Sequence, residues 1–94
     1  MSLRDDYEPL VERYKREMLI EFSANEHKES WKRWSLDKAM GEIHYHVAKL
    51  EYATRHTNTD GWDKVREYAA DIGNMAAMLI DCLQLWTPES EAQP

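Results

Sequence analysis

The chain has 94 residues, of which 43% are hydrophobic and 32% charged, and its formal net charge is −6. This length allows one domain with a modest core. An acidic chain without a basic cluster repels phosphates on average, so no nucleic-acid-binding role is expected. The longest apolar run, Met75–Ile80, is far too short to span a bilayer, and no membrane partner is expected.

The cysteine content and the first residues bear on the compartment. Cys82 is the single cysteine, so no intrachain disulfide can form, which is typical of a reducing compartment. The N-terminal sequence MSLRDDYEP lacks the apolar segment of a secretory signal. We therefore expect a cytoplasmic protein with a single domain over residues 1–87 and a disordered tail over residues 88–94.

The first predicted helix covers about residues 7–24, with Asp6 as its expected N-cap and Pro9 in its first turn. Its apolar stripe consists of Tyr7, Leu10, Val11, Tyr14, Met18 and Phe22. A polar connector with two tryptophans, Trp31 and Trp34, follows this helix. The tryptophans either fasten the connector to the helices or form a stacking wall for a nucleobase, with Lys28 near the phosphates.

The second and third helices are predicted from apolar periodicity. Ser35 is the expected N-cap of the second, whose seam consists of Leu36, Met40, Ile43, Val47, Leu50 and Thr54. After the turn RHTNTDG, Asp60 is expected to cap the third helix, which Thr87-Pro88 ends. The seam of the third helix consists of Val65, Ala69, Ile72, Ala76, Leu79, Leu83 and Trp86.

These elements predict an all-α fold, an antiparallel helical hairpin plus one N-terminal helix. The stretch IGNMAAMLIDCLQLW is apolar on nearly every side, and such a helix needs cover all round. Tyr45, Ala48 and Tyr52 add a second apolar strip outside the main seam of the second helix. We therefore expect self-association to a dimer or tetramer that completes a helical bundle. The alternative is a monomer with a few exposed apolar side chains.

Polar side chains are predicted to converge beside the two seams. A short turn makes the second and third helices antiparallel neighbours, and stepping back one residue rotates a side chain by about 100°. This places two polar stripes on the same side of the pair, and the levels match when counted from the turn. The expected facing pairs are Lys49 with Glu67, His46 with Asp71, and Glu42 with Asn74.

The segments HKESWKRWSLDKAM, GEIHYHVAKLEYAT and REYAADIGNMAAMLID, taken in this order, resemble the MazG-like all-α nucleotide pyrophosphohydrolases, especially their short phage-type members. The similarity extends over about residues 15–85. Such proteins hold Mg²⁺ with an E-x-x-E pair on one helix and an E-x-x-D pair on the next. They hydrolyse (deoxy)nucleoside triphosphates to the monophosphate and pyrophosphate, and their short chains form dimers or tetramers.

The resemblance implies specific site residues in the third helix. Asp71 falls on the aspartate of the family, Glu67 on the acid one turn earlier, and Asn74 on the polar residue that follows. Glu67 and Asp71 are thus the implied catalytic and metal-binding residues, with Glu42 as a further metal ligand. Asn74, Lys28 and Trp31 are the implied substrate contacts.

The first metal motif departs from the family pattern. His46 and Lys49 stand where the E-x-x-E pair is expected, and Tyr68 stands where a further acid is expected. Lysine opposes a bound cation, and imidazole is a poor ligand for Mg²⁺. A Lys49–Glu67 ion pair and a His46–Asp71 hydrogen bond could occupy the place of the metal. Two hypotheses stay open: an active pyrophosphohydrolase, and a non-catalytic nucleotide-binding or structural oligomer.

Overall fold

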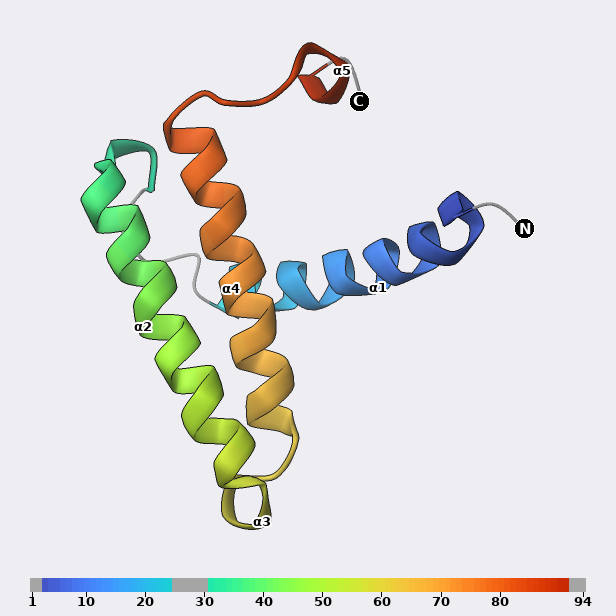
Figure 1. Ribbon diagram of the computed structural model, residues 1–94, viewed down its shortest axis with the longest axis vertical. Helices are drawn as coiled ribbons and strands as arrows, with labels where there is room; N and C mark the ends of the chain where they lie inside the picture. Colours follow the sequence, from blue (N-terminus) through green and yellow to red (C-terminus); the bar gives the residue numbers. More distant parts are fainter. Residues whose placement is uncertain (1–2, 25–30, 92–94) are drawn as a thin grey trace.

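The computed structural model describes residues 3–24 and 31–91, and every regular element in these ranges is a helix (Figure 1). The predicted all-α class is confirmed. The elements are α1 (Leu3–Ala24), the 3-10 helix η1 (Trp31–Arg33), α2 (Leu36–Arg55), α3 (Thr57–Asp60), α4 (Asp63–Cys82) and α5 (Pro88–Glu91). Helix α2 packs along α4, while α1 crosses α4 and projects to one side (Figure 1). No helix in the described ranges has the length and apolar character needed to cross a membrane.

The helix starts confirm one predicted cap and correct two others. Ser35 caps α2, because its hydroxyl accepts a hydrogen bond from the backbone N–H of Lys38 at 3.1 Å. Helix α1 begins at Leu3, so Asp6 lies within its first turn, where a carboxylate favours the helix dipole. Asp60 ends α3 instead of capping α4, because Gly61, at φ 75°, turns the chain between these two helices.

Helix α4 ends at Cys82, short of the predicted end near Trp86. Gln84 adopts the left-handed conformation, with φ 56°, that glycine usually provides after a helix. The N–H of Leu85 donates to the carbonyl of Ile80 at 3.0 Å, and that of Gln84 to the carbonyl of Asp81 at 3.1 Å, which is a Schellman motif. In the tail, Pro88–Glu91 forms the helical turn α5, and residues 92–94 lie outside the described residues.

The most buried stripes of α2 and α4 are rotated from the predicted seams. Leu36 and Met40 are exposed, and the buried positions of α2 are Ala39, His46 and Ala53, spaced by seven residues. In α4 the buried residues are Ala70, Asp71 and Asn74. In α2 these positions lie one residue before the predicted seam, a rotation of roughly 100°, although Ile43, Val47 and Leu50 of that seam are half-buried. In α4 the shift is not uniform, because Ala70 and Asp71 lie between the predicted seam residues Ala69 and Ile72. Small alanine side chains let the helices pack closely here, so polar residues enter the interface.

Only part of the apolar stripe of α1 is covered by its own chain. The Tyr14 hydroxyl donates to the carbonyl of Ala69, and the Phe22 ring lies 6.4 Å from that of Trp31. Toward the N-terminus, Tyr7, Leu10 and Val11 are each more than half exposed. Figure 1 shows this end of α1 extending away from α2 and α4. One half of the stripe thus packs on α4, and the other half faces outward.

Candidate functional site

A cavity of about 640 Å³ lies where α1, η1, α2 and α4 meet. Its apolar lining consists of Leu19, Phe22, Trp31, Trp34, Met75 and Met78. Its polar lining consists of Glu21, Ser23, Glu42, His46, Lys49, Glu67, Asp71 and Asn74. All six side chains of the predicted polar stripes, together with Trp31, therefore line one cavity. Lys28, the remaining predicted contact, lies outside the described residues.

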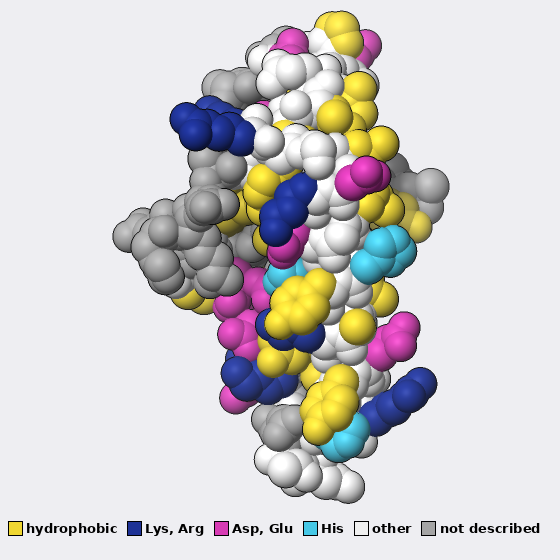
Figure 2. Space-filling view, turned by 90° about the vertical axis from the view of Figure 1, so that its left-hand side faces the viewer, with side chains coloured by type: hydrophobic (Ala, Val, Ile, Leu, Met, Phe, Trp, Pro, Cys, Tyr) yellow, Lys and Arg dark blue, Asp and Glu magenta, His cyan; other side chains and the backbone are white. Residues whose placement is uncertain are grey.

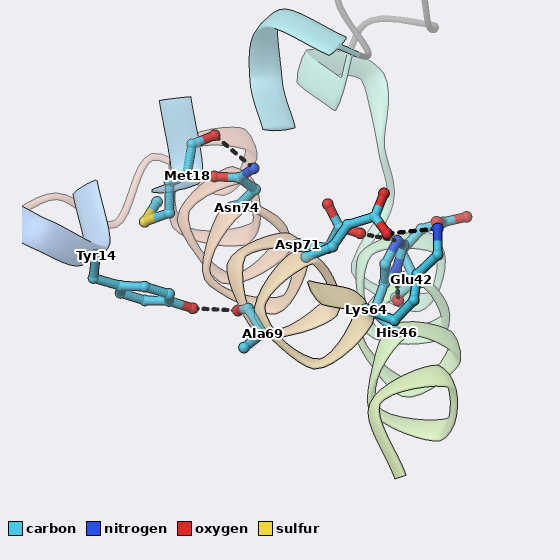
Figure 3. A network of polar contacts seen from close by, with 9 residues as sticks. Tyr14, Met18, Glu42, His46, Lys64, Ala69, Asp71 and Asn74 are labelled. Carbon is cyan, nitrogen blue, oxygen red and sulfur yellow. Dashed lines mark hydrogen bonds and ion pairs between the residues drawn. The ribbon is translucent and has the colours of Figure 1, made fainter. Parts of the chain in front are cut away.

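His46 is the most constrained of the α2 side chains in this cavity. Its Nδ1 lies 2.7 Å from the backbone carbonyl of Glu42, one turn earlier, and its side chain is 10% exposed. A carbonyl oxygen only accepts hydrogen bonds, so Nδ1 carries the proton and, in a neutral ring, Nε2 presents a lone pair. Nε2 lies 3.9 Å from Oδ2 of Asp71. Figure 3 shows both side chains pointing into the space between α2 and α4.

The expected pairing of His46 with Asp71 is present as proximity, but their separation exceeds hydrogen-bonding distance. The predicted Lys49–Glu67 ion pair is wrong for the described residues: Glu67 pairs with Lys64 at 3.1 Å instead. The Lys49 amino group lies 4.5 Å from the ring centroid of Tyr68, a cation–π contact. Lys49 therefore lines the cavity, and its amino group contacts the Tyr68 ring instead of the Glu67 carboxylate.

Asn74 brings an unpaired acceptor to the cavity. Its side-chain N–H donates to the backbone carbonyl of Met18 at 3.1 Å, which fixes the amide orientation (Figure 3). The residue is 2% exposed, and its Oδ1 has no hydrogen-bond partner. A buried acceptor without a donor is costly, and this oxygen is closed to solvent, so a ligand reaches it only if neighbouring side chains move.

Glu21 adds a carboxylate from α1 that the sequence analysis did not include. Burial raises the pKa of Glu21, and the nearby carboxylates of Asp71 and Glu67 raise it further. Burial also raises the pKa of Tyr14, whose hydroxyl stays protonated as the donor that ties α1 to α4. Helix α1 thus contributes Glu21, a carboxyl group with a raised pKa, to the cavity lining. It also contributes Tyr14, which binds the Ala69 carbonyl of α4.

Whether the cavity suits a Mg²⁺ ion depends on the oxygen ligands that its side chains offer. This ion takes oxygen ligands in a compact octahedral arrangement. Within residues 3–24 and 31–91, no three His, Cys, Asp or Glu side chains are grouped so that they could hold one ion. Glu42 pairs with Lys38 at 2.9 Å, and Glu67 pairs with Lys64. The described residues therefore do not fit a resident Mg²⁺ ion, and the predicted ligands Glu42, Glu67 and Asp71 share a cavity without forming a metal cluster.

The arrangement combines two chemically different surfaces. The lining contains indole and other apolar side chains as well as a cation, carboxylates and an amide. Planar rings stack on indoles, while ammonium groups attract phosphates. Such a combination is typical of a site for a small molecule with an aromatic part and a charged part.

The cavity residues of α1 were not predictable from the sequence. Periodicity assigns Phe22 to an apolar stripe but gives no crossing angle for α1, so neither Phe22 nor Glu21 could be placed beside Asp71. Asp81 was missed too, although it accepts a hydrogen bond from the Trp31 indole at 3.0 Å. The available signal was an acidic residue within the mostly apolar stretch IDCLQLW.

Comparison with models of protein families, with curated proteins and with solved structures finds no match to this chain. The residues of the cavity are therefore the basis on which function is inferred.

Proposed function

We propose that this chain is a MazG-like protein that binds a (deoxy)nucleoside triphosphate in the cavity between α1, α2 and α4. The observation that carries the proposal is the lining itself, in which indole rings and the polar groups of two helices meet around about 640 Å³. The likeness of the HKESW, GEIHYH and REYAADIGN segments to MazG-like proteins supports the same ligand class.

Each part of the ligand has a counterpart in the lining. The base stacks on Trp31, and Asn74, which lines the same cavity, is assigned to the substrate on the resemblance. Lys49 supplies positive charge to the phosphates, because no carboxylate among the described residues pairs with its amino group. Lys28 is assigned to the phosphates as well, on the resemblance alone.

Hydrolysis of the bound triphosphate to monophosphate and pyrophosphate is the second candidate function. Glu42, Glu67 and Asp71 still line one cavity, and the Nε2 lone pair of His46 faces Asp71 at 3.9 Å. His46 is thereby oriented to accept a proton from an attacking water. Glu42 and Glu67 are paired with lysines, which oppose a bound metal ion. These ion pairs favour a protein that binds the nucleotide without hydrolysing it.

Calorimetric titration with a panel of deoxynucleoside triphosphates, with and without Mg²⁺, tests binding. We expect Lys49→Gln to weaken binding by about tenfold, because a charge-assisted contact is worth roughly 1.5–3 kcal/mol. Lys15→Gln is the matched control, since Lys15 pairs with Glu12 on the surface of α1, outside the cavity. No binding by the unaltered protein, or equal loss in both variants, contradicts the proposal.

A pyrophosphate-release assay with Mg²⁺ or Mn²⁺ separates the two candidates. Turnover that Asp71→Asn abolishes establishes hydrolysis. A silent protein that still binds nucleotide, and that gains metal binding when His46→Glu and Lys49→Glu are combined, establishes the binding role. In the second case the metal motif has been lost while the cavity has been kept.

We also propose that the chain self-associates to a dimer or tetramer that completes a helical bundle. Figure 2 shows apolar side chains along the α2 face between charged ones. In α2, Tyr45 and Tyr52 are each about 60% exposed.

A further inference from the structure

The Trp31 wall of the cavity is held by a carboxylate that lies outside the cavity lining. The indole N–H of Trp31 donates to Oδ2 of Asp81 at 3.0 Å. The indole N–H of Trp86 donates to Oδ1 of the same carboxylate, also at 3.0 Å. Trp31 lines the cavity, whereas Asp81 and Trp86 do not. Asp81 therefore joins the cavity wall to the end of α4 and to the segment that follows it.

The hydrogen bond and one ring contact together set the orientation of the Trp31 indole. An indole has a single N–H donor, so its bond to Asp81 fixes the direction of that edge of the ring. The Phe22 ring, 6.4 Å away and inclined at 40°, limits rotation about this bond. A charged acceptor makes such bonds stronger than neutral ones. The two indole N–H groups lower the pKa of Asp81, so its carboxylate is ionised at neutral pH.

We propose that Asp81 is a positioning residue for the nucleobase: it holds the Trp31 indole as the surface on which the base of a bound nucleotide stacks. The proposal rests on nucleotide binding in the cavity and assigns the planar base, not the phosphates, to this wall. Asp81 touches no ligand and acts only through Trp31. Its removal should therefore weaken the binding of ligands that carry a base and spare ligands that are phosphate alone.

The test compares deoxynucleoside triphosphates with inorganic tripolyphosphate in calorimetric titrations of the full chain. Asp81→Asn keeps the side-chain shape but turns an N–H₂ group toward one of the two indole donors. We expect it to lower nucleotide affinity by about tenfold, within the range for loss of one base-stacking contact. Affinity for tripolyphosphate should stay unchanged. Trp31→Ala should show the same split between the two ligands.

Two further variants separate positioning from general support. Asp63→Asn makes the same chemical change at the exposed start of α4, where Asp63 pairs with Arg66, and should leave both affinities unchanged. Trp86→Phe removes one indole donor and leaves the Trp31–Asp81 bond in place, so a fall of a few-fold at most is expected for nucleotides.

The outcomes distinguish failure of the positioning role of Asp81 from failure of nucleotide binding itself. Equal weakening of nucleotide and tripolyphosphate by Asp81→Asn, or no change in either, overturns the positioning role and leaves nucleotide binding standing. If the unaltered protein binds no nucleotide, the proposed function fails and the positioning role fails with it. Circular dichroism of each variant shows whether the helices are retained. If Asp81→Asn does not fold, Trp31→Phe tests the link, because it keeps an aromatic ring in the wall and removes the N–H that Asp81 accepts.

Discussion

Glu21 of α1 lies near the carboxylates of Asp71 and Glu67 in α4. Its pKa is raised above the ordinary value of 4.5, first by burial and then by Asp71 and Glu67. The folded chain therefore binds this proton more tightly than the unfolded chain, and stability falls as pH rises through the window above 4.5. We expect Glu21→Gln to raise the melting temperature at pH 7, and the gain to vanish near pH 4.

Thermal unfolding followed by circular dichroism between pH 4 and pH 8 measures this effect. Glu12→Gln, an exposed substitution on the same helix, is the control and should change the melting temperature little at any pH. A gain for Glu21→Gln that is equal at pH 4 and pH 7 would show that the charge of Glu21 is not its cause.

The sequence allowed part of the site to be predicted at the level of single residues. Helical spacing and the antiparallel pairing of α2 with α4 suffice to predict that His46 lies near Asp71, because this proximity depends only on the register of the two helices. The partner of each charge was not predictable in the same way. Lys64 is closer to Glu67 along its own helix than Lys49 is across the interface, and Lys49 finds Tyr68 instead. Long flexible side chains choose among several partners that register alone does not rank.

At the scale of helices, the start of α2 depends on one side chain. Ser35 accepts a hydrogen bond from Lys38 N–H at 3.1 Å and satisfies one of the free donors of the first turn. Ser35→Ala should lower the free energy of unfolding by about 1 kcal/mol, measured by urea denaturation. Ser35→Asp keeps an acceptor at the same place and should retain most of the stability. Equal losses in both variants would show that capping is not the cause.

Two helix glycines with different surroundings test the crossing of α1 over α4. A Cβ added to Gly41 meets nothing within 4 Å, whereas a Cβ on Gly73 would collide with the ring and hydroxyl of Tyr14. Gly41→Ala should therefore raise the free energy of unfolding by about 1 kcal/mol through helix propensity. Gly73→Ala should lower it, because Tyr14 must leave its bond to the Ala69 carbonyl.

Urea denaturation of both glycine variants gives the comparison, and a double variant supplies the control. In a Tyr14→Ala background the obstacle is gone, so Gly73→Ala should become stabilising, as Gly41→Ala is. A stabilising effect of Gly73→Ala with Tyr14 in place would mean that Tyr14 is easily displaced and that the crossing does not depend on it.

The existence of the three long helices was predictable, and their ends and rotations were less so. Apolar periodicity located α1, α2 and α4, and Ser35 was recognised as a cap. The end of α4 was missed because Gln84 provides the left-handed turn without a glycine. The seams were predicted only in part, because periodicity weights large side chains, while the most buried positions are alanines together with His46, Asp71 and Asn74.

At the scale of the whole molecule, the outward half of the α1 stripe is, beside the α2 face, an apolar surface that the proposed dimer or tetramer should cover. Light scattering coupled to size exclusion should give a mass of two or four chains of 11.2 kDa. The combined changes Leu10→Gln and Val11→Gln should raise the dissociation constant of the oligomer several-fold, because they remove apolar area without adding charge. The measured mass should therefore fall toward that of the monomer. Glutamine is retained in helices, so α1 itself should persist.

The matched control combines Glu12→Gln with Arg13→Gln, which leaves the net charge unchanged and alters the polar side of the same helix turn. It should keep the mass of the unaltered protein. A monomer mass for the unaltered chain at every concentration would contradict self-association, and equal dissociation by both variants would place the interface elsewhere.

The alanines between α2 and α4 have a consequence for how the chain tolerates variation. Ala39, Ala53 and Ala70 are at most 1% exposed, and no large side chain in the described ranges is fully buried. Enlarging a tightly packed site forces helices apart and costs about 1–3 kcal/mol for each added group. A saturation mutagenesis scan should therefore find its least permissive helix positions at the smallest residues, and the leucines should be the freer ones. Sequence variation in this fold should therefore be limited most strongly at the buried alanines.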